Sequence, residues 1–191
     1  MNHLLAFTLC LYLLAQARAE EETFFKPGEG RDESYFAPTL RFSNTAGVLG
    51  IWPGLRLGWS KGSILSAGLE GYVLANEVHA DEPEGERLQM AVGGVVLEST
   101  SASDLRVHPT YSVLIGAGGS NTGRVPDLDS MAIYSFIVVE PAVNIEFNIT
   151  RNFRVTPGVS YRWISGSVRG MHSKWSVSET SFNVAFKLKD H

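Results

Sequence analysis

Cysteine is nearly absent from this chain of 191 residues, since Cys10 is the only one. It lies in an apolar run that ends shortly before the small-x-small sequence Ala17-Arg18-Ala19. This order predicts a signal peptide over residues 1–19, cleaved after Ala19, with a buried helix as the alternative. The mature chain of 172 residues (191 − 19) would then contain no cysteine, which excludes disulfides and thiolate metal sites.

Two further absences narrow the class of protein. After residue 19 no apolar run approaches the roughly 18 residues that a transmembrane helix needs. Without Arg18 the mature chain carries 15 Lys and Arg against 20 Asp and Glu, a net charge of −5 (15 − 20) with histidine neutral. This balance argues against binding to nucleic acid or through a basic membrane-surface patch. Segments with a helical period are few, while glycine, β-branched and aromatic residues are common, so we expect an all-β chain.

The clearest pattern that is present runs from Ile133 to Trp163. Two long segments alternate apolar and polar residues on either side of the polar turn 148–152. Successive side chains of a strand point to opposite faces, so the pattern predicts a long β-hairpin with one apolar face. Strands of this length suit a wall that crosses a bilayer. The apolar face comprises Ile137, Val139, Pro141, Val143, Ile145 and Phe147, followed by Phe153, Val155, Pro157, Val159, Tyr161 and Trp163.

The rest of the chain extends this pattern to eight strands in a single domain over residues 35–191, after a flexible segment at 20–34. The predicted spans are 35–43, 48–59, 64–76, 88–99, 105–117, 131–147, 153–165 and 177–189. Short connections (60–63, 100–104, 148–152) alternate with long ones (77–87, 118–130, 166–176), and only the first outer connection, 44–47, breaks the rhythm. This rhythm predicts an eight-stranded antiparallel up-and-down transmembrane β-barrel, with both termini in the periplasm and the long loops outside.

Three stretches of the chain carry a resemblance to a known family. Gly54-Leu-Arg-Leu-Gly-Trp59, the segment from Glu140 to Arg154, and Gly158-Val-Ser-Tyr-Arg-Trp-Ile-Ser-Gly166 resemble the small outer membrane β-barrel proteins of Gram-negative bacteria, many of which have no assigned activity. The resemblance implies an eight-stranded barrel inserted by the barrel assembly machinery. Such barrels usually end in an aromatic residue, whereas this chain ends in His191.

The polar face of the predicted strands carries charges of both signs, which would point into a closed barrel. Eight strands enclose only enough space for side chains or one small ligand. Two of the acids could act as a general acid and base, but buried opposite charges more often satisfy one another. We therefore expect an interior salt-bridge network formed by Arg41, Arg56, Glu70, Glu98, Glu140, Glu146, Arg154, Arg162 and Lys187.

Prolines are the unusual feature of the predicted strands. Each removes a donor from the hydrogen-bond ladder, so we expect β-bulges around them, with a broken soluble sheet as the alternative. All five are predicted on the apolar face: Pro38, Pro53, Pro109, Pro141 and Pro157.

The predicted long loops offer one further candidate site. Residues 77–86 contain five acids and His79, and Asp127 and Asp129 lie in the next loop. No EF-hand spacing is present, so a solvated acidic rim, or divalent ions bridging it to lipopolysaccharide phosphates, is the preferred interpretation.

These features favour an outer membrane protein with a structural or surface-interaction role through its extracellular loops, without catalysis, cofactor or metal. We expect a monomer whose partners are outer membrane lipids and lipopolysaccharide. One alternative is a lipid-modifying barrel enzyme that uses Ser, His and an acid, for which His108 and Ser112 lie four residues apart on one strand face. The other is a soluble periplasmic lipid-binding barrel, which requires the apolar face to point inward.

Overall fold

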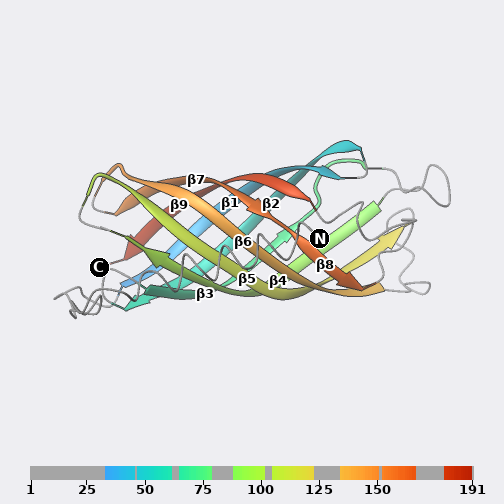
Figure 1. Cartoon of the computed structure of the whole chain (residues 1–191), viewed down its shortest axis with the longest axis horizontal. Helices are drawn as coiled ribbons and strands as arrows, with labels where there is room; N and C mark the ends of the chain where they lie inside the picture. The colour runs from blue at the N-terminus through green and yellow to red at the C-terminus, as the bar shows by residue number, and fades with distance from the viewer. Residues whose placement is uncertain are drawn as a thin grey trace, which may run out of the picture.

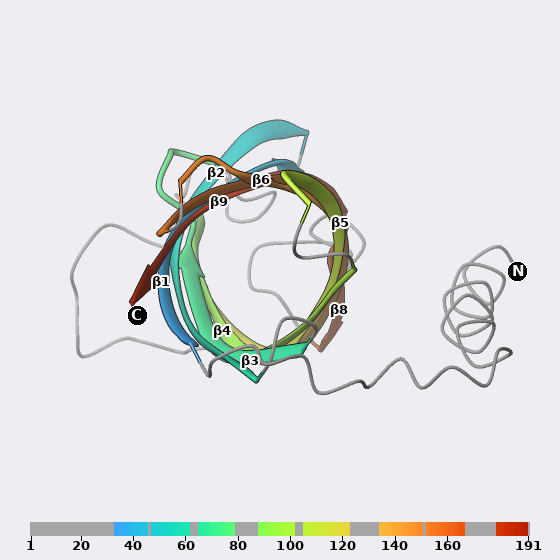
Figure 2. The same cartoon turned by 90° about the vertical axis from the view of Figure 1, so that its left-hand side faces the viewer.

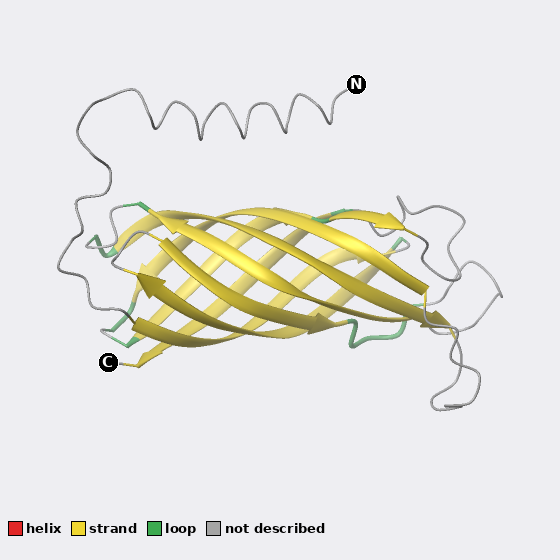
Figure 3. Ribbon diagram, turned by 90° about the horizontal axis from the view of Figure 1, so that it is seen from below, coloured by secondary structure: helices red, strands yellow, loops and turns green. Residues whose placement is uncertain are grey.

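The computed structural model describes residues 33–45, 47–61, 65–78, 88–101, 105–122, 134–150, 152–166 and 179–190. These residues form strands and their connections, without a helix (Figure 3). The strands are β1 (Glu33–Thr45), β2 (Val48–Lys61), β3 (Leu65–Val73), β4 (Leu88–Thr100), β5 (Val107–Thr122), β6 (Tyr134–Asn148), β7 (Phe153–Tyr161), β8 (Trp163–Gly166) and β9 (Thr180–Asp190). The predicted signal peptide and nearly all of the predicted flexible segment, 20–34, lie outside the described residues.

The strands close into a ring of antiparallel neighbours (Figure 2). From β1 to β6 each strand pairs with the next along the chain. β6 then pairs with both β7 and β8, β7 pairs with β9, and β9 pairs with β1 to complete the circle. β7 and β8 pair with β6 in one register, with Ser160 opposite Ala142 and Trp163 opposite Val139. They are therefore two parts of one wall strand, interrupted at Arg162, and the wall has eight strands. The predicted fold class, an eight-stranded antiparallel up-and-down barrel, is confirmed.

The register of the pairs sets the tilt and the width of the barrel. Paired residues followed once around the wall run through Glu33, Ser60, Ser66, Glu98, Ser112, Ala142, Ser160, Ser181 and Ser43. The path returns to β1 ten residues beyond its start (43 − 33 = 10), so the shear of the barrel is ten. With ordinary strand dimensions, this shear gives a strand tilt of about 40° and a wall radius of about 8 Å. The strands are visibly oblique to the long axis (Figure 1).

The apolar face of the strands points outward. Ile137, Val143 and Val159 are 58 %, 57 % and 52 % exposed, although all three belong to the predicted apolar face. From Ile137 to Phe147 the outward positions of β6 cover ten residues along the strand (147 − 137 = 10), or a height of about 25 Å at this tilt. That height matches the apolar band of a transmembrane barrel, about 25 Å.

The two ends of the barrel differ in their connections. β1 begins at Glu33 and β9 ends at Asp190 at one end of the barrel, which we name the turn end (Figure 1). β1, β3, β5 and β8 end at the other, which we name the loop end. Strands that meet at the turn end are separated by few residues and those that meet at the loop end by many, except that only two residues separate β1 from β2. This is the predicted alternation of short and long connections, with its one exception.

The expectation of bulges at the prolines is wrong for the described strands. Pro38 and Pro53 both sit in a β1–β2 ladder whose register is unchanged from Glu33↔Ser60 to Thr45↔Val48. The registers of β5 with β6 and of β7 with β9 also continue past Pro109 and Pro157. Where the β6 ladder is interrupted near Pro141, it resumes in the same register. Because each proline ring points outward, it needs no space inside the wall. Each proline therefore removes one hydrogen-bond donor and leaves the register intact.

One predicted strand end is also wrong. The segment 118–130 was expected to form a loop, but β5 continues to Thr122 and pairs with the beginnings of β4 and β6. Gly118 lies in this extension of β5 and provides space inside the wall for the Phe136 ring, which an added Cβ would strike.

Close approach of the backbone explains a second pair of glycines, Gly94 and Gly116, which face each other across β4 and β5. A Cβ on Gly94 would lie 2.5 Å from the carbonyl oxygen of Ile115. We expect Gly94→Ala to cost about 1–3 kcal/mol of the free energy of unfolding, because backbone atoms must move. Gly93→Ala is the matched control, since its Cβ would point outward with no atom nearer than 3.8 Å. Urea unfolding in lipid vesicles measures both, and equal effects would contradict the close-approach explanation.

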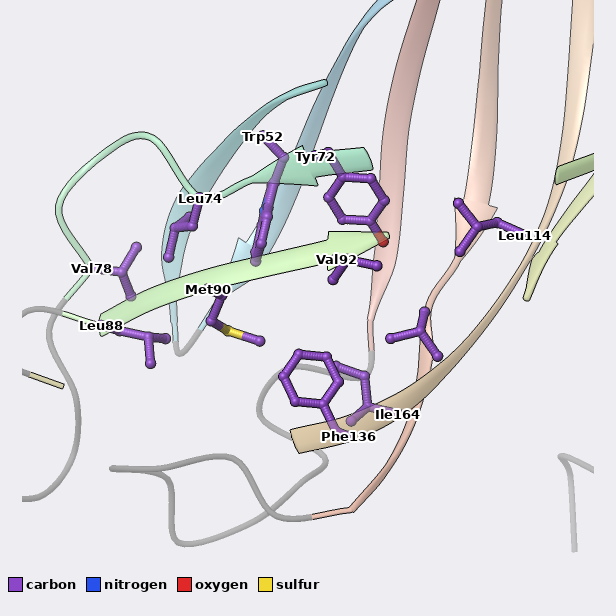
Figure 4. Packing of buried hydrophobic residues seen from close by; sticks show 11 residues of the cluster. Trp52, Tyr72, Leu74, Val78, Leu88, Met90, Val92, Leu114, Phe136 and Ile164 are labelled. Atoms are coloured by element: carbon purple, nitrogen blue, oxygen red, sulfur yellow. The ribbon is translucent and has the colours of Figure 1, made fainter. Parts of the chain in front are cut away.

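The loop-end half of the lumen contains an apolar cluster (Figure 4). Its side chains come from opposite parts of the wall and converge in the interior. The sequence predicted a network of charged residues in the interior, and this apolar cluster was not predicted. We name it the apolar cap; it comprises Trp52, Tyr72, Leu74, Val78, Leu88, Met90, Val92, Leu114, Phe136, Val138 and Ile164.

Candidate functional site

All nine charged residues predicted for the interior lie on the inward face of the wall. Eight of them are buried, and the side chain of the ninth, Arg154, is 16 % exposed. Side chains of a strand alternate between its two faces, and each of the nine residues is an even number of positions from the buried residues of its strand. All nine therefore face inward. Cation and carboxylate then lie within reach of each other across a lumen only about 16 Å wide between backbones.

At the turn end the contacts centre on Lys187. Its ammonium group contacts Glu98 and lies 2.5 Å from an oxygen of Glu146. Arg154 donates to the other oxygen of Glu146 at 2.5 Å. Arg56 Nη1 lies 3.1 Å from Glu98, which connects this group to the middle of the barrel. Every carboxylate here therefore has two cationic partners.

In the middle of the barrel the partners are arginines. Arg56 donates from Nε and Nη2 to one oxygen of Glu70, at 3.0 and 2.8 Å. The other oxygen of Glu70 accepts from Arg41 Nη2 at 2.6 Å, and Arg41 Nε donates to Glu140 at 3.1 Å. The two arginines thus hold one fully buried carboxylate between them, an arrangement that offsets the cost of burying it.

Towards the loop end the contacts meet at Glu140. Its two oxygens also accept from the Tyr72 hydroxyl at 2.6 Å, from Ser160 at 2.7 Å and from Arg162 Nε at 3.4 Å. The guanidinium of Arg162 lies over the Trp52 ring, 4.3 Å from its centroid, beneath the apolar cap. Stacking on an aromatic face stabilises a cation that has few polar partners.

A tenth residue, Glu179, extends this series, and the sequence analysis did not name it. Its Oε1 lies 3.9 Å from Arg162 Nη1 and accepts from Ser43 at 2.7 Å and Thr45 at 2.8 Å. Its parity is that of Lys187, eight residues on (187 − 179 = 8), so the alternation of the last strand could have identified it.

Together the ten residues form one series of alternating charge, which we name the lumen network. It balances five cations with five carboxylates, so it has no net charge when all are ionised. In order from the turn end its members are Arg154, Glu146, Lys187, Glu98, Arg56, Glu70, Arg41, Glu140, Arg162 and Glu179.

The lumen network also climbs along the barrel axis. Because the shear is ten over eight strands, each step from a residue to its paired residue on the next strand of the wall raises the position along the barrel axis by 10/8 of a residue. On this geometry the members follow one another upward in the order given, over a height of about 24 Å. Oppositely charged side chains therefore extend through nearly the whole height of the outward apolar band.

Little free space remains between these side chains. A cavity of about 10 Å³ lies beside Arg41, Arg56, Glu70 and Glu140. A space of this size holds at most about one water molecule. At this level the interior is filled by its own side chains and has no room for a substrate.

The residues of the enzymatic alternative are not brought together. His108 lies with Nδ1 3.0 Å from the Leu105 carbonyl oxygen and Nε2 3.3 Å from Glu146. Ser112 instead accepts from Asn144 at 3.4 Å. Within the described ranges no connected series of hydrogen bonds links a serine to a histidine and the histidine to an acid. His172 and nearly all of the acidic segment at 77–86 lie outside those ranges.

Two further features are absent from the described residues. No group of three or more histidine, cysteine or acidic side chains there could hold a metal ion. No helix among them is long and apolar enough to span a membrane.

Comparisons with known proteins reveal similarity of structure only. No family model matches the chain, and no curated protein matches its sequence. The N-terminal β-barrel domain of Pseudomonas aeruginosa OprF is similar with a TM-score of 0.59 and 10 % identity, covering 85 % of this chain and 100 % of that one. Neisserial surface protein A (NspA) also has a TM-score of 0.59 and 10 % identity, covering 83 % of this chain and 95 % of that one. The chain therefore shares the fold of small solved β-barrels over nearly their whole length.

Proposed function

We propose that this protein is an outer membrane β-barrel with a structural or surface-interaction role, exerted through its loop-end connections and without catalysis. One observation carries the proposal: the apolar face of the wall points outward, and the charged face lies inside. In water this arrangement would expose a continuous apolar band, which soluble monomers avoid. In a bilayer the same band is favourable, and the charges are kept away from lipid.

The same facing opposes the soluble lipid-binding alternative. A lipid-like ligand would need an apolar lumen, yet Glu140 and Glu146 are 3 % and 1 % exposed inside the wall. Buried side chains of the lumen network and the apolar cap project into the lumen, and we propose that they plug the barrel. The similarity of the fold to the β-barrel domain of OprF and to Neisserial surface protein A supports a role of this kind.

In this proposal the turn end faces the periplasm and the loop end faces outward. The partners are outer membrane lipids and lipopolysaccharide, which surround the apolar band and the loop-end rim. The barrel assembly machinery inserts the exported chain after cleavage at Ala19, and the barrel acts as a monomer. Specificity then resides in the loop-end connections, because the wall offers lipids a nearly uniform apolar surface.

Fractionation of expressing cells tests the location. We expect the protein in the outer membrane fraction, with a gel mobility that changes on heating because a closed barrel resists detergent until it is boiled. Recovery in the soluble periplasmic fraction would contradict the proposal. The lipid A mass profile of the same cells addresses catalysis, and a profile altered by the gene would favour the enzymatic alternative.

A charge placed on the outward face tests contact with lipid directly. Val143 lies near mid-height of the apolar band and is 57 % exposed. We expect Val143→Arg to destabilise the barrel in lipid vesicles by about 2–4 kcal/mol, because arginine is costly at the bilayer midplane. Val107→Arg is the matched control at the turn end, 50 % exposed, where the cost should be about 0–1 kcal/mol. Equal small effects at both positions would argue that the outward face meets water.

A further inference from the structure

The lumen network has one incomplete link, between Arg162 and Glu179. Their nearest side-chain atoms, Nη1 and Oε1, are 3.9 Å apart, which is too far for a hydrogen bond. The Arg162 side chain is fully buried, yet neither Nη1 nor Nη2 has a hydrogen-bond partner among the described residues. The second oxygen of Glu179, Oε2, and the hydroxyl of Ser181 are likewise buried without a partner there.

The backbone places the three residues that carry these atoms beside one another. The main chains of Arg162 and Glu179 exchange two hydrogen bonds, of 2.8 and 3.0 Å, so their side chains project inward from directly opposed positions. Ser181 is the next inward residue and is paired with Ser160, which lies two residues before Arg162 on its own strand. Leaving a buried polar group unsatisfied costs about 1–3 kcal/mol. Four such atoms in one group point to a shared partner.

The charges around this group determine what the partner can be. An anion would meet the carboxylates of Glu179 and Glu140, and a cation would meet the guanidinium of Arg162. The partner must accept from Arg162 and donate to Glu179 Oε2, and it must be small enough for a buried site. Water has all of these properties, and buried waters typically make about three hydrogen bonds.

We infer that an internal water molecule is bound between Arg162, Glu179 and Ser181, where it completes the lumen network at its loop end. Separations beyond about 3.5 Å between opposite polar groups are commonly bridged in this way. Ser43 and Thr45 hold the other oxygen of Glu179, so the carboxylate is fixed on one side by the wall and on the other by the water. The inference concerns the interior and does not depend on the proposed surface role.

Magnetic resonance of the full-length protein, folded in deuterated detergent micelles with ¹⁵N-labelled arginine, tests the site with water itself as the probe. We expect cross-peaks between the η protons of Arg162 and the water resonance. Ser181→Val replaces the hydroxyl with a methyl group and should abolish them. Ser66→Val, the same change at a buried serine near the turn end, should leave them unchanged.

Absence of these cross-peaks from the folded wild-type protein would overturn the inference, as would their survival at full intensity in Ser181→Val. A crystal structure provides a second measurement that needs no variant to fold. An ordered water within hydrogen-bond distance of Arg162 and Glu179 would support the site. Direct contact of Arg162 Nη1 and Nη2 with the Glu179 carboxylate would exclude it.

Discussion

Replacement of Glu140 with alanine is expected to lower the free energy of unfolding by about 3–5 kcal/mol. Glu140 is 3 % exposed and is the shared acceptor for Arg41, Arg162, Tyr72 and Ser160. Its removal leaves Arg162 without a direct ion-pair partner within hydrogen-bond distance. The cost arises because a buried cation loses its counter-charge, and truncation at a buried ion pair carries this penalty even where the intact pair adds little.

Urea unfolding in lipid vesicles, followed by tryptophan fluorescence and by heat-modifiable mobility, measures this effect. Glu33→Ala is the matched control, because Glu33 pairs with Lys189 at the turn-end rim and its side chain is 23 % exposed. A rim pair should contribute about 0–1 kcal/mol. If Glu140→Ala were no more costly than Glu33→Ala, the lumen network would not be a closely coupled, desolvated structure.

Truncation of Phe136 to alanine is expected to cost about 3–5 kcal/mol. The ring is 2 % exposed in the apolar cap, and it packs against Gly118 on the neighbouring strand. Both the lost burial of the ring and the cavity left in a rigid, closed wall contribute to the cost. The wall cannot collapse onto the cavity, because its radius is set by the number of strands and the shear.

Phe147→Ala separates these contributions, since it makes the same chemical change on the outward face. Phe147 is 37 % exposed, and its loss should cost about 1.5–3 kcal/mol at most, the burial contribution alone. The same unfolding measurement applies to both variants. An equal cost for the two truncations would show that the apolar cap is not tightly packed.

Much of the candidate site could be predicted because its basis is local. Arg154 and Lys187 were expected inside since each alternates with apolar neighbours, and the alternation of a strand fixes the face on which a side chain lies. Glu179 was missed although it shares the parity of Lys187, because both of its neighbours in the sequence, Ser178 and Thr180, are polar. The predicted strand end near residue 117 was wrong for a different reason: Gly118 lies within β5 and makes room for the Phe136 ring on the adjacent strand.

The apolar cap could not be predicted from alternation. β4 is apolar on both faces, so its sequence does not reveal which residues lie inside. Trp52 and Tyr72 share the parity of Arg56 and Glu70, but nothing local indicates that they meet side chains from β6 and β8. Their convergence depends on strands distant in the sequence.

The sequence by itself therefore determined the number of strands, the rhythm of the connections and the face of most side chains, because each follows from a period of two or from local turns. Only the tertiary structure decided which charges meet. Partners in the lumen network depend on a shear of ten and on the barrel radius, and both are properties of the closed ring. A strand shifted by two residues in register would keep its charges inside and give them different partners.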